Sequence, residues 1–152
     1  MNLGAYQARL EDTLRSRRDL EIESLDFRQK SKGTIMTARV RFYDQSFLGI
    51  VEEVIPSEAR TVEKVRYVFH YQSADGALIF RYDNSPHFPD LPTFPSHKHT
   101  ADGVIAAEAP DLAAVLREID AILYPLYTRM EKNTDESSNY PCFLLSVYTP
   151  PS

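Results

Sequence analysis

Apolar and polar residues alternate with a period of two through much of the first half of the chain, which predicts β-strands. The clearest run has apolar residues at every second position: Met36, Ala38, Val40 and Phe42, with Thr37, Arg39 and Arg41 between them. The parity of the apolar residues changes between residues 20–22 and 25–27, which predicts a β-bulge near Glu23-Ser24. Residues 47–55 form a further apolar-rich strand before Pro56.

Residues 62–72 and 77–83 are rich in Val, Tyr and Phe, and Asp75-Gly76 lies between them. Asp-Gly flanked by such runs predicts a β-hairpin with a two-residue loop. The predicted register is Gln72 opposite Ile79, Tyr71 opposite Phe80, Phe69 opposite Tyr82, His70 opposite Arg81 and Val68 opposite Asp83. The aromatic pairs then form the core face, and the polar face gathers Arg66, His70, Arg81 and Asp83.

Helical spacing of apolar residues predicts a short helix over Ala5–Arg17 and a long one over Ala109–Leu126. Between them, prolines recur at intervals of three, at Pro86, Pro89, Pro92 and Pro95. This spacing matches polyproline II and predicts an ordered strap over residues 84–100. Residues 97–106 and 143–148 are expected to be strands, and residues 131–140 a polar loop.

Together these elements predict a single α+β domain over residues 1–152. It has an antiparallel sheet of about five to seven strands, with the N-terminal helix and the long C-terminal helix packed on one face. Composition limits the classes of function. The single cysteine excludes a disulfide framework within the chain, and no apolar run is long enough to span a bilayer, so a cytoplasmic location is expected. The net charge of −5 argues against a general polyanion binder.

All four histidines lie in residues 70–99, and His97 and His99 form an H-x-H pair. In an extended chain both imidazoles point the same way, as two ligands of one metal ion would. Zinc and similar metals need three or four ligands, and His87 is the nearest further histidine. A metal site at His87, His97 and His99 is therefore one alternative, and a polar surface without a ligand is another.

Metal-independent phosphodiester cleavage is the other chemistry that these residues suit, because it needs a proton acceptor, a proton donor and cations for the phosphate charge. No cofactor is then required. The candidate catalytic residues are His70, Arg81, Asp83, His87, His97 and His99. The candidate phosphate-binding residues are Lys98, Arg66, Arg39 and Arg41. Surface ion pairs of little energetic weight would explain the arginines equally well.

One block of the chain resembles a known family. The elements F-R-Y-D-N at residues 80–84, P-H at residues 86–87 and F-P-x-H-x-H at residues 94–99 occur in order, and the block from 65 to 105 resembles the TumE-like toxins. The resemblance implies the toxin of a type II toxin–antitoxin pair from bacteria or archaea, encoded beside a DNA-binding antitoxin. Phe88 stands where many relatives carry a further histidine, which weakens a metal site built on adjacent histidines.

Three hypotheses follow from the sequence. The first is a toxin that acts on RNA as an endoribonuclease, with Asp83 orienting a histidine while Arg81 and Lys98 hold phosphate. The second is a non-enzymatic module that binds a protein partner, and the third is a metal-dependent hydrolase that uses the H-x-H pair. The sequence leaves open which RNA is the target, whether the protein forms a homodimer, and the order of the strands.

Overall fold

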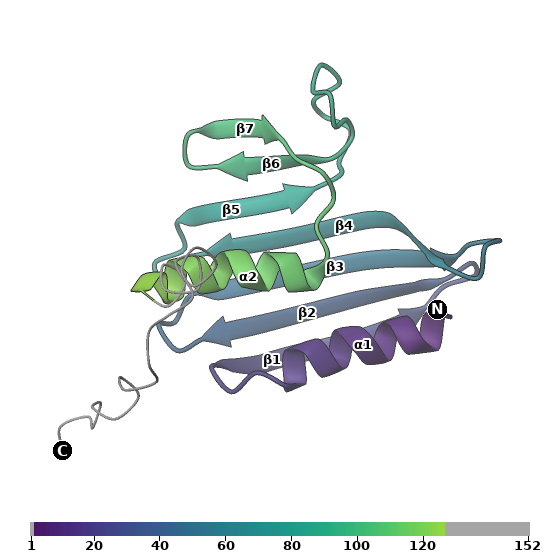
Figure 1. Cartoon of the computed structure of the whole chain (residues 1–152), viewed down its shortest axis with the longest axis horizontal. Coiled ribbons are helices and arrows are strands. Elements are labelled where there is room, and N and C mark those ends of the chain that lie inside the picture. Colours follow the sequence, from purple (N-terminus) through teal and green to yellow (C-terminus); the bar gives the residue numbers. More distant parts are fainter. Residues whose placement is uncertain (1, 127–152) are drawn as a thin grey trace, which may run out of the picture. The chain divides into compact units, whose positions relative to one another are not determined.

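A seven-stranded antiparallel sheet dominates the computed structural model, in which residues 2–126 are described (Figure 1). Its strands follow one another in sequence order, each paired with the next. Their bounds are β1 Leu20–Gln29, β2 Thr34–Phe42, β3 Phe47–Pro56, β4 Val62–Gln72, β5 Leu78–Asp83, β6 His97–Thr100 and β7 Gly103–Ala106. The α+β class and the strand number agree with the prediction. The loop expected over residues 131–140 and the strand expected over residues 143–148 lie outside the described residues.

The alternation in β2 is confirmed, since Met36, Ala38, Val40 and Phe42 are at most 3% exposed. The predicted bulge is also present, because the β1–β2 register shifts between Ile22 and Ser24. The buried side chains define the core face of the sheet, which continues through Leu48 and Ile50 into β4. The residues between them, with Thr37 and Arg39 as examples, form what is here called the polar face.

The hairpin of β4 and β5 keeps most of the predicted register but not the predicted loop. Ser73 and Ala77 close a three-residue loop, in which Gly76 has φ of +88°. Gln72 therefore pairs with Leu78, and a one-residue irregularity follows at Ile79. Since that extra residue offsets the odd loop length, the four predicted pairs between residues 68–71 and 80–83 are confirmed.

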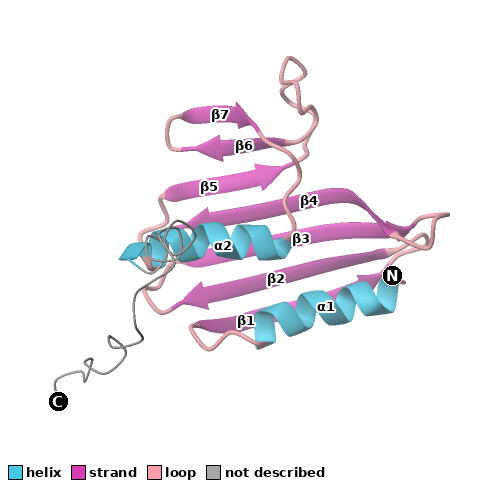
Figure 2. Ribbon diagram, viewed as in Figure 1, coloured by secondary structure: helices cyan, strands magenta, loops and turns pink. Residues whose placement is uncertain are grey.

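Residues 84–96 form successive tight turns, so the prediction of a polyproline II strap is wrong (Figure 2). Backbone N–H groups donate to the carbonyl three residues earlier, from Leu91 to Phe88, from Phe94 to Leu91 and from Ser96 to Thr93. Polyproline II has no such internal bonds. The first two turns share Leu91 and have Pro89 and Pro92 at the second position, which proline favours. Pro95 is the third residue of the last turn. A proline spacing of three therefore fits successive turns as well. We call residues 84–96 the turn segment.

The single strand expected over residues 97–106 is a hairpin of two short strands. Thr100 pairs with Gly103 across the turn at Ala101-Asp102, and Gly103 has φ of +130°. Glycine tolerates this conformation because it has no Cβ. The hairpin adds β6 beside β5, which brings His97 and His99 onto the sheet.

Both helices are present with shifted bounds: α1 spans Leu3–Arg15 and α2 spans Leu112–Leu123. Asn2 caps α1, and Asp111 accepts a hydrogen bond from the Ala114 N–H at 2.7 Å, so α2 begins later than expected. Pro125 disfavours helical geometry at the preceding residue, and α2 ends at Leu123. The long helix predicted from residue 109 is therefore wrong, because α2 has 12 residues.

The chain divides into two compact units, residues Met1–Val115 and Leu116–Ser152. The sheet, α1 and the turn segment all belong to the first. In this unit Leu10 and Leu14 of α1 are buried, and the Tyr6 hydroxyl donates to Glu52 of β3 at 2.6 Å. Burial and the Glu52 charge raise the pKa of Tyr6 well above its ordinary value, so Tyr6 stays a hydrogen-bond donor. The single domain over residues 1–152 stays a prediction.

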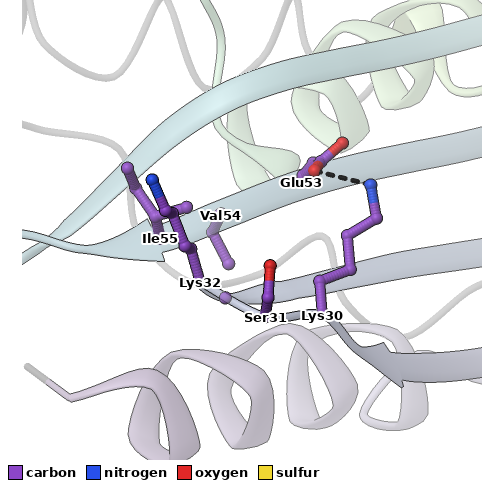
Figure 3. Close-up of a pocket in the computed structure, with 7 residues that line it drawn as sticks. Lys30, Ser31, Lys32, Glu53, Val54 and Ile55 are labelled. Carbon is purple, nitrogen blue, oxygen red and sulfur yellow. Dashed lines mark hydrogen bonds and ion pairs between the residues drawn. The ribbon is translucent and has the colours of Figure 1, made fainter.

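Adding one methyl group at Gly33, in the β1–β2 turn, is expected to have a large effect on stability. Figure 3 shows this turn, with Lys30 Nζ 2.7 Å from Glu53 Oε1. A Cβ at Gly33 would lie 2.0 Å from the backbone oxygen of Val54. Gly33→Ala is expected to lower the free energy of unfolding by about 1–3 kcal/mol, measured by urea denaturation. Gly4→Ala in α1 has room and is expected to stabilise, so equal losses would contradict the steric explanation.

Candidate functional site

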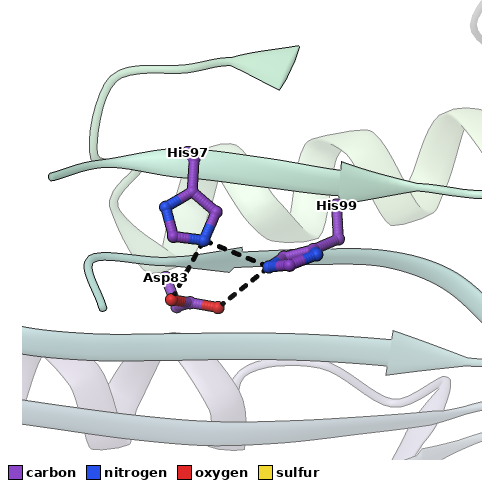
Figure 4. A group of neighbouring side chains, drawn as sticks. All are labelled: Asp83, His97 and His99. Carbon is purple, nitrogen blue, oxygen red and sulfur yellow. Dashed lines mark hydrogen bonds and ion pairs between the residues drawn. The ribbon is translucent and has the colours of Figure 1, made fainter. Parts of the chain in front are cut away.

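Strand pairing brings the histidines of β6 onto the polar face beside β5. Asp83 pairs with His97, and Arg81 pairs with His99. Because side chains alternate along a strand, all four point to the same side of the sheet. Figure 4 shows Asp83 in contact with both imidazoles, which also contact each other. We call Arg81, Asp83, His97 and His99 the Asp83 cluster.

Every member of the Asp83 cluster lies within contact distance of another. His97 Nε2 is 3.2 Å from Asp83 Oδ1, and His99 Nε2 is 3.5 Å from Asp83 Oδ2. The two Nε2 atoms are 3.1 Å apart. Arg81 donates through Nε to Asp83 Oδ2 at 2.8 Å. The carboxylate therefore connects one guanidinium and two imidazoles.

The turn segment fixes the orientation of His97. Nδ1 of His97 lies 2.9 Å from the carbonyl oxygen of Pro95. A carbonyl only accepts, so Nδ1 carries the hydrogen and Nε2 faces Asp83 and His99. Nε2 of His99 also faces Asp83. Where this nitrogen carries a hydrogen, it donates to Asp83, and Nδ1 of His99 keeps the lone pair that can accept a proton. Where neither Nε2 carries a hydrogen, both lone pairs face the Asp83 carboxylate.

Asp83 is ionised in this environment although only 2% of the residue is exposed. Burial raises its pKa, but the hydrogen bonds from Arg81 and from the Ser85 N–H, at 2.9 Å, outweigh burial and hold the pKa below its ordinary value. The cluster thus contains a stable buried anion.

His99 is the member of the histidine pair that solvent reaches. Its side chain is 30% exposed, whereas that of His97 is 1% exposed. Burial lowers the pKa of His99, Asp83 opposes that shift, and the charges of His97 and Arg81 add to it. His99 is therefore neutral at neutral pH and can accept a proton from a bound molecule.

Phe88 packs against both histidines from the turn segment. Its ring centroid lies 4.8 Å from that of His97 and 5.8 Å from that of His99. The position at which a second adjacent histidine was expected thus provides an apolar wall. His87 beside it is exposed, and it is not part of the Asp83 cluster.

The other predicted site residues are placed as follows. His70 lies opposite Arg81, with Nε2 3.1 Å from Gln72 Oε1, while its buried Nδ1 has no hydrogen-bond partner. Lys98 points to the core face, where Nζ lies 4.9 Å from the centroid of the Tyr82 ring. The structure therefore separates Lys98 from the histidines on either side of it.

The remaining arginines lie on the polar face away from the cluster. Arg39 is exposed, and its guanidinium carbon lies 4.4 Å from the centroid of the Phe47 ring. Arg39 and Arg41 both approach Glu23. Arg66 is exposed on β4.

Some contributors to the site carry no signal in the sequence. The Pro95 carbonyl and the Ser85 N–H are backbone groups, which any residue supplies. The contact of Phe88 with the H-x-H pair depends on how the turns fold. Gly49, which pairs with His70 on the polar face, was not singled out. A glycine inside an apolar strand was the available signal.

In a comparison with protein families, the family described as Toxin TumE matches residues 8–123. The match covers all seven strands and α2. No curated protein and no solved structure matches the chain significantly. Among residues 2–126, none of the helices has the length and apolar character that crossing a membrane requires.

Proposed function

The chain belongs to the TumE toxin family, and from that premise we propose that it arrests growth by cleaving RNA at the Asp83 cluster. Family membership makes it a toxin of a toxin–antitoxin system, with an antitoxin as partner. The proposed antitoxin is a DNA-binding protein, and the proposed site of action is the cytoplasm, where the RNA is. The observation that carries the RNA proposal is a neutral, accessible His99 beside a guanidinium and a buried imidazole–carboxylate pair.

RNA cleavage without a cofactor uses the 2′-hydroxyl as the nucleophile. In the proposed reaction His99 removes the 2′-hydroxyl proton, and the 2′-oxygen attacks the adjacent phosphorus. The bond to the 5′-oxygen breaks, that oxygen takes a proton from water, and the hydroxide left behind removes the proton from His99. The products are a 2′,3′-cyclic phosphate and a 5′-hydroxyl end. Arg81, with its side chain 38% exposed, faces the non-bridging oxygens, where negative charge develops.

His97 and Asp83 act in this proposal as positioning residues. His97 is buried, so it does not reach the substrate, but its Nε2 is in contact with that of His99. Asp83 holds both imidazoles and favours the protonated form that His99 adopts after the first step. In this arrangement His99 is the base, and His97 and Asp83 hold and orient its ring, as third groups orient the base in catalytic triads.

A second candidate, a metal-dependent hydrolase, is favoured by two observations. The ligand atoms of Asp83, His97 and His99 all lie within 4.8 Å of one another. The donation of His97 Nδ1 to a backbone carbonyl is also the outer-shell contact typical of a ligating histidine. The ligand set would be Asp83 with the H-x-H pair, rather than His87. Against it, Arg81 and Ser85 already bond both carboxylate oxygens.

The first experiment compares the two candidates directly. The toxin is co-expressed with its antitoxin, separated from it, and incubated with single-stranded RNA with and without EDTA. We expect cleavage that EDTA does not change, new ends bearing cyclic phosphate, and growth arrest when the toxin is expressed alone. Loss of cleavage in EDTA, restored by one divalent metal, would select the hydrolase. Growth arrest with all RNA intact would instead favour the protein-binding module.

A further inference from the structure

One row of paired residues crosses the polar face and ends at the proposed reaction centre. The strand registers pair Arg39 with Gly49, Gly49 with His70, His70 with Arg81 and Arg81 with His99. Directly paired residues point to the same side of a sheet, so these five positions form one line across β2 to β6. Gly49 is the position in this row without a side chain.

A hollow of about 320 Å³ lies over Gly49. Arg39 and Phe47 line it on the β2 and β3 side, and Val68 and His70 line it on the β4 side. The hollow combines apolar walls with an exposed guanidinium, and the unpartnered Nδ1 belongs to the histidine at its β4 edge. Such a lining suits a flat aromatic ligand that also carries hydrogen-bonding groups.

The chain itself does not require glycine at residue 49. A Cβ there would lie 3.5 Å from the Phe47 ring and 3.9 Å from the His70 oxygen, which are ordinary contacts. The φ angle is not in the left-handed region, and the β2–β3 register has no bulge at this point. Glycine inside a strand weakens it, and such glycines often mark a bulge, a bend or the close approach of a ligand or another backbone. With no bulge here and ordinary contacts for a Cβ, ligand approach is the explanation that we pursue.

We propose that the hollow over Gly49 binds a nucleobase of the RNA strand whose phosphate lies at Arg81 and His99. This inference rests on the proposed function. Three strand spacings, about 14 Å, separate Gly49 from His99, so the base belongs to a nucleotide near the scissile phosphate and not to the reacting one. Arg39 stacks against the base from one side, as arginine does in recognition of single-stranded RNA. His70 lines the hollow at the other side.

The test fills the hollow without touching the reaction centre. Gly49→Ala, Gly49→Val and Arg39→Gln are compared with wild type for binding to a 2′-O-methyl RNA, which cannot be cleaved, by fluorescence anisotropy. Gly49→Val is expected to weaken binding about 5–150-fold, the range for loss of one stacked base, and Gly49→Ala less. The Tm of both glycine variants should equal or exceed that of wild type. Ala77→Val, at the exposed β4–β5 turn, adds similar bulk elsewhere and should bind as wild type.

Two results would overturn the inference, and they are distinguishable from failure of the proposed function. If folded Gly49→Val and Arg39→Gln both bind the RNA as wild type does, the hollow is not a base site, although the toxin still acts on RNA. A loss of antitoxin binding in these variants, with RNA binding intact, would assign the hollow to the protein partner. If the wild-type protein neither binds nor cleaves RNA, the proposed function itself is wrong, and the base site that rests on it is rejected with it.

Discussion

Replacing His99 by alanine is expected to lower kcat for RNA cleavage by about 10²–10⁴-fold, the usual contribution of a general base. His99 is the accessible imidazole of the Asp83 cluster, and burial keeps it neutral. Purified wild type and His99→Ala are compared on one short RNA, with growth arrest as the second readout. The comparison variant is His87→Ala, since His87 is exposed and lies outside the cluster. A loss at His87 as large as that at His99 would contradict the assignment.

The pH profile of the same reaction gives a readout that a purely structural role would not change. The neutral form of His99 is the active one, so kcat should fall as the pH drops through its pKa. Because that pKa is lowered, the fall is expected below the ordinary value of about 6.5. In His99→Ala the base is absent, so this fall of kcat at low pH should disappear. An unchanged acid limb in the variant would show that another group titrates.

The largest expected effect on stability is that of Lys64→Met, which should lower the free energy of unfolding by about 3–5 kcal/mol. Lys64 Nζ lies 2.8 Å from Oε1 of Glu52, which is 1% exposed on the core face. Oε1 of Glu52 has the Lys64 ion pair but no well-aligned hydrogen bond. Removal of the lysine therefore leaves the buried carboxylate with one partner, the Tyr6 hydroxyl on its other oxygen. Urea denaturation measures the loss.

The matched control for Lys64→Met is Lys30→Met. Lys30 also pairs with a glutamate of β3, at 2.7 Å from Glu53, but its side chain is 47% exposed. An exposed pair contributes about 0–1 kcal/mol, so Lys30→Met should be nearly neutral. The double variant Lys64→Met with Glu52→Gln removes the buried charge and should recover part of the loss. Equal losses for both lysine variants would show that burial of Glu52 does not decide the effect.

Residue pattern predicted the parts of the site that depend on local geometry. Alternation within β4 and β5, with the Asp75-Gly76 turn signal, placed His70 opposite Arg81. The H-x-H spacing put His97 and His99 on one side of an extended chain. Pattern did not predict that Asp83 pairs with His97, because that register depends on how residues 84–96 return the chain to β5.

The errors have physical reasons of the same kind. A proline spacing of three fits both polyproline II and successive turns. The backbone hydrogen bonds decide between the two, and any residue except proline can donate them, so the residue pattern does not reveal them. The strand expected over residues 97–106 contained a turn because Gly103 allows a positive φ. Lys98 was grouped with its neighbours by charge, although alternation along a strand sends it to the opposite face.

The sequence-order sheet has a consequence for how quickly the toxin forms its site. Every strand pairs with its neighbour along the chain, which keeps the mean sequence separation of paired strands short for a sheet of this size. Low contact order favours fast folding. The Asp83 cluster spans residues 81–99, on two strands that are neighbours along the chain, so we expect it to assemble as the sheet folds. The antitoxin is therefore expected to meet a toxin whose cluster is already formed.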